Sequence, residues 1–365
     1  MIFSDEEELD AFLPDGEGDP EGEFFEHFRI IVDKGQDLLR IDKFLHNRME
    51  KTSRTKLQAA ADVGNILVND KPVKSNYRIK PYDVISIVLP HPPRIIELKG
   101  ENIPLDIVYE DDDVVVINKQ AGLVVHPGYG NYTGTLVNAL LYHFENMPSQ
   151  PGDVRPGLVH RLDKNTSGIM LMAKNEYALA FLAKQFFNRT TKRTYQAVVW
   201  GDMKEDKGTI VGNIGRDLRD RKIMAVFPEG SEMGKHAVTH YTVLQRFGYV
   251  TLVECRLETG RTHQIRAHMK HIGHPLFNDD TYGGDKILKG TTFTKYKHFV
   301  ENCFTICPRH ALHAKSLGFV HPTTGEELFF DSELPADMQA LLNKWTVYGN
   351  AVNLKGDSAE EEEEG

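Results

Sequence analysis

The chain of 365 residues is 40% hydrophobic and 26% charged, an ordinary globular composition with enough length for two domains. No apolar run approaches the roughly 18–20 residues of a membrane-spanning helix, and the N-terminus lacks the basic and apolar regions of a signal peptide, so no membrane association is expected. The three cysteines, Cys255, Cys303 and Cys307, are too few for a disulfide framework, and we expect a cytoplasmic location.

The formal net charge of −10 is concentrated at the two ends of the chain. Residues 1–26 hold eleven acidic side chains and residues 356–365 hold six, with no Lys or Arg in either segment. The remaining residues, 27–355, include 43 basic and 36 acidic side chains and carry a net charge of +7. Because like-charged blocks cannot bury enough apolar surface to fold, we expect acidic disordered tails over 1–27 and 346–365.

The pattern over 28–90 predicts a small α/β unit. Residues 28–32, 66–68 and 84–88 are predicted strands, and 40–49 is a predicted amphipathic helix with apolar side chains at helical spacing. Ser53 has the position of an N-cap for a second helix, which should end near Gly64. A turn is predicted at Asn69-Asp70-Lys71.

Residues 91–104 begin with His91-Pro92-Pro93 and are predicted to form a linker, because proline fixes φ and removes a backbone donor. The large domain is expected over 105–345. Its predicted strands are 114–117, 168–173, 195–200, 240–245 and 251–257, and its predicted helices are 175–189 and 262–272. Many strands with a few interspersed helices indicate an α+β fold with a mixed or antiparallel sheet.

The chemically most informative segment is His160 to Gly168, which lies between two apolar stretches. Within it, Asp163 is flanked by Arg161 and Lys164, whose charges would lower the pKa of the carboxyl group and keep it ionised. A carboxylate on a loop between two core strands is a candidate nucleophile or stabiliser of a cationic sugar. A surface turn with ordinary salt bridges is the alternative, and the pattern alone leaves both open.

The segment from His160 to Gly168 resembles the HRLDxxTSG signature of the RluA family of pseudouridine synthases. Residues 216–241 are most similar to the RluD-type members, which act on large-subunit ribosomal RNA. Gln120 stands where the family usually has proline. The other segments that resemble family motifs follow in the family's order: Asn118 to Pro127, Lys192 to Gly201, Gly260 to His268, Arg309 to Ala314 and His321 to Gly325.

This resemblance implies an enzyme that detaches uracil from C1′ of a uridine, turns the base and rejoins it through C5. It implies that Asp163 is the catalytic carboxylate and that Arg266 forms an ion pair with it. Tyr195 would stack on the uracil and accept the C5 proton, although a phenol with a pKa near 10 needs help from its surroundings for that role. Arg161 would grip or replace the extruded base, Leu312 would pack against Tyr195, and the other residues expected to bind substrate are His160, Arg261 and His263.

The segment 28–90 resembles the S4 RNA-binding domain. The resemblance rests on Arg40 to Leu45, Ser53 to Gln58 and Val68 to Lys74. Basic side chains in such a unit can neutralise phosphates and give salt-dependent affinity that is largely independent of sequence. The residues expected to contact RNA are Arg40, Lys43, Arg54, Lys56, Lys71 and Lys74.

No cofactor is expected, because the isomerisation moves atoms within one nucleotide and needs no electron or group carrier. The set Cys303, Cys307, His310 and His313 contains zinc-ligand residue types, but its spacing is not that of a standard zinc site, and no metal is expected. The expected partner is large-subunit ribosomal RNA or its precursor, bound by a monomer. Three alternatives remain: a transfer-RNA target, a non-catalytic RNA-binding factor, and a carboxylate-based nucleoside hydrolase, which would usually need a second catalytic acid.

Overall fold

In the computed structural model, the described residues are 25–49, 53–89, 98–127, 131–144, 147–148, 156–217, 220 and 223–363. Their contacts divide the chain into two compact units. The first comprises the described residues of Met1–Ile103, His126–Glu145 and Ser149–Pro156. The second comprises those of Pro104–Val125, Asn146–Pro148 and Gly157–Gly365.

The first unit contains a four-stranded antiparallel sheet in the order β1-β4-β2-β3. Its core joins the sheet to two helices through buried residues such as Phe44, Leu57 and Ile85. The Ser53 side chain accepts a hydrogen bond from the backbone N–H of Lys56, which confirms the predicted N-cap. The elements are β1 (Phe25–Ile31), α1 (Ile41–Arg48), α2 (Arg54–Asp62), β2 (Ile66–Val68), β3 (Lys71–Pro72), β4 (Val84–Leu89) and α3 (Leu136–His143).

Helix α3 is hydrogen-bonded to the last part of the predicted linker. The backbone N–H of Glu101 donates to the carbonyl oxygen of Asn138, and Asn138 Nδ2 donates to the carbonyl oxygen of Lys99. Residues 98–103 are therefore tied to a folded element instead of forming a free linker. The preceding part of the predicted linker, 90–97, lies outside the described residues.

A buried carboxylate organises the N-terminal pair of helices. The side chain of Asp42 is fully buried and accepts hydrogen bonds from Arg40, Arg54 and Gln58. Although burial on its own would raise the pKa of Asp42, these donors lower it from 3.8 to about 2. Asp42 thus fixes two of the arginines predicted to contact RNA while leaving nearly half of each arginine side chain exposed.

We expect Asp42→Asn to destabilise this unit by about 2–3 kcal/mol at neutral pH. A carboxylate with a depressed pKa in the folded state contributes stability that is present above pH 4 and is lost as the pH falls towards 2. Amide hydrogen exchange of α1 and α2 in the full chain, compared with the wild type at each pH, measures the difference. Asp62→Asn, which changes an exposed carboxylate of the same helix pair, is the control, and equal protection in Asp42→Asn and the wild type would contradict this account.

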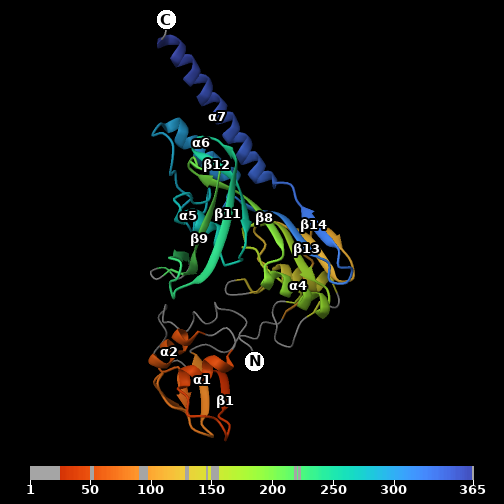
Figure 1. Cartoon of the computed structure of the whole chain (residues 1–365), viewed down its shortest axis with the longest axis vertical. Helices are drawn as coiled ribbons and strands as arrows, with labels where there is room; N and C mark the ends of the chain where they lie inside the picture. Colours follow the sequence, from red (N-terminus) through yellow and green to blue (C-terminus); the bar gives the residue numbers. More distant parts are fainter. Residues whose placement is uncertain are drawn as a thin grey trace. The chain divides into compact units, whose positions relative to one another are not determined.

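Ten strands of the second unit, as far as it is described, form one mixed sheet in the order β10-β9-β11-β12-β8-β13-β7-β6-β5, with β14 paired to β13. Figure 1 labels β8, β9, β11, β12, β13 and β14 of this sheet. The β13–β7 pair is parallel and the other pairs are antiparallel. This confirms the predicted α+β fold. The strands are β5 (Ile107–Glu110), β6 (Val114–Lys119), β7 (Ser167–Ala173), β8 (Lys192–Trp200), β9 (Lys207–Arg216), β10 (Met224–Phe227), β11 (Lys235–Arg246), β12 (Val250–Leu257), β13 (Leu312–Val320) and β14 (Glu327–Asp331).

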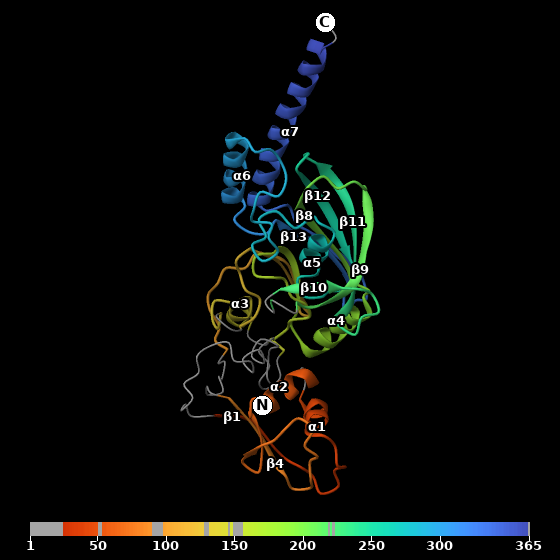
Figure 2. The ribbon, with the colours of Figure 1, turned by 90° about the vertical axis from the view of Figure 1, so that its left-hand side faces the viewer.

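Four helices cover this sheet in the described part of the second unit. Helix α4 packs on β7 and β13, α5 on the part formed by β9, β10 and β11, and α6 against α7 (Figure 2). Alternation along β8 separates two sides of the sheet. Val198 and Trp200 join the core beneath α6 and α7, whereas Tyr195 and Ala197 point to the other side. The helices are α4 (Glu176–Asn188), α5 (Gln264–His271), α6 (Thr294–Ile306) and α7 (Ala336–Glu363).

The described parts of the two predicted disordered tails, 1–27 and 346–365, are folded. Strand β1 begins at Phe25, so residues 25–27 belong to the first sheet. The prediction of a disordered tail over 346–365 is wrong up to Glu363, because α7 continues to that residue (Figure 1). Trp345 anchors the helix in the core and Tyr348 stacks on Phe299 at 4.6 Å, and the Ala, Glu, Lys and Leu that follow favour helix. No helix in the described chain is long and apolar enough to cross a bilayer.

Candidate active site

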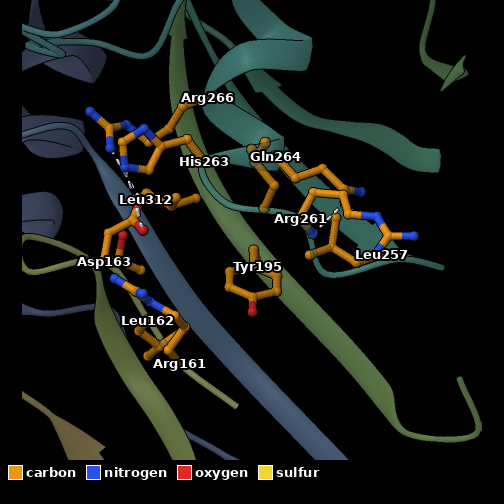
Figure 3. A pocket seen from close by; sticks show the side chains of 12 residues that line it. Arg161, Leu162, Asp163, Tyr195, Leu257, Arg261, His263, Gln264, Arg266 and Leu312 are labelled. Atoms are coloured by element: carbon orange, nitrogen blue, oxygen red, sulfur yellow. Dashed lines mark hydrogen bonds and ion pairs between the residues drawn. The ribbon is translucent and has the colours of Figure 1, made fainter. Parts of the chain in front are cut away.

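The second unit has a pocket that seven of the eight predicted catalytic and substrate-binding residues line (Figure 3). They come from four places that are distant in sequence: the loop before β7, strand β8, the start of α5 and the start of β13. The seven residues are Arg161, Asp163, Tyr195, Arg261, His263, Arg266 and Leu312. The fold therefore assembles the separate sequence segments into one site.

Asp163 forms an ion pair with Arg266, and a second carboxylate, Asp279, fixes the orientation of Arg266. Arg266 Nη1 donates to Asp163 Oδ2 at 3.1 Å, and the opposite edge of the same guanidinium donates to both oxygens of Asp279 at 2.7 and 2.9 Å. Asp279 is fully buried and the Arg266 side chain is 5% exposed, whereas Asp163 remains 20% exposed on the pocket side. Such a bidentate pair fixes the guanidinium, so Arg266 presents one N–H to Asp163 in a defined direction.

The surroundings of Asp163 favour its charged form. Burial alone would raise the pKa of Asp163, but His263 while it is protonated and the permanently charged Arg266 lower it, and the net shift is downward. The carboxylate is therefore ionised at neutral pH. A partly desolvated, ionised carboxylate of fixed orientation can attack an electrophilic carbon or accept a proton.

Buried cations hold the loop that carries Asp163. Lys119 Nζ donates to the carbonyl oxygens of Gln120, Leu123 and Lys164, and Arg309 Nη1 donates to that of Asn165. Burial lowers the pKa of Lys119 to about 7, while Asp163 opposes the shift. Three carbonyl acceptors match the three donors of an ammonium group, so these contacts favour a charged Lys119 beneath the loop.

The start of β7 requires glycine. Gly168 has φ +118°, and a Cβ atom there would lie 2.2 Å from the carbonyl oxygen of Ala314 on β13. Only glycine combines this backbone conformation with such a close approach. The short distance between β7 and β13 places the Asp163 loop beside Leu312, which faces the same pocket.

Tyr195 lies in the pocket as a buried, neutral phenol. Its ring is 8% exposed, and burial together with Asp163 raises its pKa, although Arg193 acts in the opposite direction. The predicted role of Tyr195 as acceptor of the C5 proton therefore gains no support from its surroundings. Leu312 pairs with Ala197 on the neighbouring strand, two residues from Tyr195 on the same side, so Tyr195 and Leu312 form an apolar wall on which a base could stack.

His160 does not line the pocket, and its prediction as a substrate-binding residue is not supported. Its ring stacks on Phe186 of α4 at a centroid distance of 4.7 Å, and its Nε2 accepts a hydrogen bond from the backbone N–H of Leu171. Burial, aided by Arg193, lowers the pKa of His160 to about 3. His160 is therefore a neutral structural residue that joins α4 to β7.

The residues considered for zinc have other partners in the structure. Cys303 and Cys307 are buried in the apolar core beneath α6 and α7. His310 Nε2 is 2.9 Å from Thr166 Oγ1, and His313 is hydrogen-bonded to Ser167 and Ser332. Both histidines therefore help to fix the segment that follows Asp163.

The residues predicted to contact RNA all lie in the first unit. Five are exposed and Lys56 is half-buried. Arg40 and Arg54 share Asp42 as a partner, so their guanidinium groups are held in place. The six residues are Arg40, Lys43, Arg54, Lys56, Lys71 and Lys74.

Sequence reasoning missed Asp279 and the role of Lys119. Asp279 lies outside every segment that resembled a family motif. The signal that could have found it is chemical: a buried arginine pointing at a functional carboxylate needs a second anion. Residues 278–280 supply acidic side chains within 14 positions of Arg266.

Comparisons with known proteins identify the family of this chain. The model of the RNA pseudouridylate synthase family matches residues 113–271, and that of the S4 domain matches residues 39–85. The chain is 50% identical over 318 residues to an RNA pseudouridine synthase of Chlorobaculum parvum, covering 86% of this chain and 96% of that one. It is 41% identical over 309 residues to the ribosomal large subunit pseudouridine synthase D of Zymomonas mobilis, covering 83% and 92%.

Among solved structures, the human RNA pseudouridylate synthase domain containing 4 is 26% identical with a TM-score of 0.50, over 66% of this chain and 92% of that one. The similarity to these relatives over most of this chain and most of theirs shows the class of protein. The chain belongs to the RNA pseudouridine synthase family and is an isomerase of uridine in RNA, with an N-terminal S4 domain.

Proposed function

We propose that this enzyme converts selected uridines of large-subunit ribosomal RNA into pseudouridine, using the Asp163 carboxylate and no cofactor. The observation that carries the proposal is the ionised Asp163, held at 3.1 Å by Arg266 in a pocket lined by Tyr195 and Leu312. The proposed target agrees with the cytoplasmic location expected from the sequence.

The first step is entry of the nucleotide into the pocket. A base inside a stacked RNA segment is out of reach of Asp163, so the uridine must be extruded at a cost of a few kcal/mol. Tyr195 and Leu312 offer an apolar wall to the base, and stacking on an aromatic ring returns about 1–3 kcal/mol. Arg161 is exposed and lines the pocket, and in this proposal it occupies or grips the position that the base leaves.

The second step uses the charge of Asp163. When the N1–C1′ bond breaks, the sugar becomes electron-poor, and an adjacent carboxylate can either bond to it or take a proton from it. After the base turns, C1′ joins C5, the C5 proton leaves and N1 gains a proton. Atoms and electrons balance within the nucleotide, which is the chemical reason for proposing a reaction without a cofactor.

Ribosomal RNA is proposed as the substrate for two reasons. The first is that relatives such as that of Zymomonas mobilis are named for the large ribosomal subunit. The second is the N-terminal unit, where Arg40 and Arg54 are held by Asp42 with exposed surface remaining. Fixed guanidinium groups can neutralise phosphates of a structured RNA without reading its sequence.

Chemical mapping of pseudouridine in total RNA tests the proposal. RNA is compared from cells with the gene, without it, and without it but expressing either the wild-type protein or Asp163→Ala. We expect marks at specific large-subunit positions to disappear on deletion, to return with the wild type, and to remain absent with Asp163→Ala. If pseudouridine were lost only from transfer RNA, transfer RNA would be the substrate in place of ribosomal RNA. Restoration of the marks by Asp163→Ala would overturn the role assigned to the carboxylate.

A further inference from the structure

His263 lies between Asp163 and a buried tyrosine. It occupies the N-cap position of α5 with a left-handed backbone, φ +52°, and its side chain is 22% exposed. Its Nδ1 is 3.1 Å from the hydroxyl oxygen of Tyr282. Its Nε2 is 3.8 Å from Oδ1 of Asp163, which lies beside it in the pocket (Figure 3). The two ring nitrogens therefore face groups of different character.

The hydrogen bonds around Tyr282 decide which nitrogen carries the proton. The backbone N–H of Met224 donates to the Tyr282 hydroxyl oxygen at 3.0 Å. Tyr282 is 4% exposed, and a buried hydroxyl without an acceptor is costly. In the described part of the chain, His263 Nδ1 is the acceptor within reach of that hydroxyl. The Tyr282 O–H then donates to Nδ1, and the proton of a neutral His263 ring resides on Nε2.

Electrostatics favour the same tautomer. With the proton on Nε2, an N–H bond points towards the Asp163 carboxylate, whereas the other tautomer would direct a lone pair at that anion. Burial lowers the pKa of His263, Asp163 and Asp279 oppose the shift, and Arg266 and Arg161 strengthen it. The ring is accordingly neutral at neutral pH, and Tyr282 remains protonated because burial raises its pKa to about 12.

The two oxygens of Asp163 consequently differ. Oδ2 accepts the hydrogen bond from Arg266, whereas Oδ1 has no hydrogen bond to the described residues and faces His263 at a distance too long for one. Active-site contacts of this kind often shorten only when the substrate is bound. Oδ1 is therefore the oxygen that remains free to act on the nucleotide.

We propose that His263 is a positioning residue, held by Tyr282 as the neutral Nε2–H tautomer, and that its N–H orients the free Oδ1 oxygen of Asp163. This inference rests on the proposed carboxylate mechanism. It adds a relay from β10 to the pocket: the Met224 backbone orients Tyr282, Tyr282 orients the His263 ring, and the ring orients Asp163.

Nitrogen NMR of the full-length protein labelled at histidine tests the tautomer directly. Two- and three-bond couplings between ring protons and ring nitrogens distinguish a protonated Nε2 from a protonated Nδ1. The His263 signals among the 16 histidines are assigned by their loss in His263→Asn, because asparagine tolerates the left-handed backbone. We expect a protonated Nε2 and an unprotonated Nδ1. A proton on Nδ1 would overturn the proposal whether or not the enzyme acts on ribosomal RNA.

Tyr282→Phe supplies the second readout. It retains the ring that lies 5.0 Å from the Arg266 guanidinium and removes only the donor to His263. We expect the fixed tautomer to be lost, kcat to fall about ten-fold, and KM to stay the same. Tyr296→Phe is the matched control, since it removes a hydroxyl that donates to the carbonyl oxygen of Lys289 outside the pocket. An unchanged tautomer and an unchanged kcat in Tyr282→Phe would contradict the relay.

Discussion

Replacing Asp163 by asparagine is expected to reduce turnover by at least about 10³-fold, the scale of losing a catalytic nucleophile, while RNA binding persists. Asparagine has nearly the same shape and can still accept a hydrogen bond from Arg266, but it has no negative charge. The fold should tolerate the change, because Asp279 continues to neutralise Arg266 through two hydrogen bonds. The loss therefore falls on the chemical step.

Release of tritium from RNA with uridine tritiated at C5 measures this prediction, because the isomerisation removes the C5 hydrogen. Single-turnover rates at saturating enzyme separate chemistry from binding. RNA affinity measured over a range of salt concentrations should decline with the same slope in the variant and the wild type, since the slope reports phosphate contacts. Glu258→Gln, which changes an exposed carboxylate paired with His240, is the control. Turnover by Asp163→Asn close to the wild-type rate would remove Asp163 from the mechanism.

Sequence patterns predicted the elements of the fold that are determined by residues close together in the chain, such as strands, helix caps and turns. The buried run at 114–117 forms the first four residues of β6, and Asn175 caps α4 through its side chain. The helix predicted over 262–272 is shorter in the structure, because His263 adopts a left-handed backbone and α5 begins at Gln264. The turn at Asn69 and Asp70 was also predicted, and both residues have positive φ.

What the sequence did not predict depends on tertiary contacts. Helix α7 continues into an acidic segment that by composition should be disordered, because Trp345 and Tyr348 dock its preceding turns. The pairing of β7 with β13, across more than 140 positions, decides that Leu312 lies beside Asp163. No local pattern contains that information, and the family resemblance alone brought the separate segments into one predicted site.

The same distinction holds within the site. Motif resemblance identified Asp163, Tyr195 and Arg266, which line one pocket. It also included His160, which the structure assigns to packing against Phe186. Resemblance to a motif does not separate a residue that touches the substrate from one that fixes the loop, whereas burial and hydrogen-bond partners do.

Asp279→Asn is expected to lower both the free energy of unfolding and the turnover of the enzyme. Asp279 is fully buried and accepts both N–H groups from one edge of Arg266 as well as the backbone N–H of Tyr282. Asparagine leaves the guanidinium without its main counter-charge, and breaking one side of a buried ion pair costs about 3–5 kcal/mol. Arg266 is then free to turn its charge fully onto Asp163, so we expect kcat to fall about 10²-fold.

Urea unfolding and tritium release measure the two effects in the same preparations. Asp280→Asn is the matched control: its carboxylate is the next residue, is exposed, and accepts a hydrogen bond only from the adjacent Thr281 among the described residues. Equal stability and turnover in Asp279→Asn and Asp280→Asn would show that the buried pair does not support the site.

The double variant Arg266→Met/Asp279→Leu separates folding from positioning. When both members of a buried ion pair are replaced by apolar side chains of similar size, no uncompensated charge remains, and such replacements are often neutral or stabilising. We therefore expect the double variant to recover most of the stability that Asp279→Asn loses, while its turnover stays as low or lower, because nothing then holds Asp163 Oδ2. Recovery of turnover together with stability would mean that Arg266 serves the fold and that Asp163 is oriented by other groups.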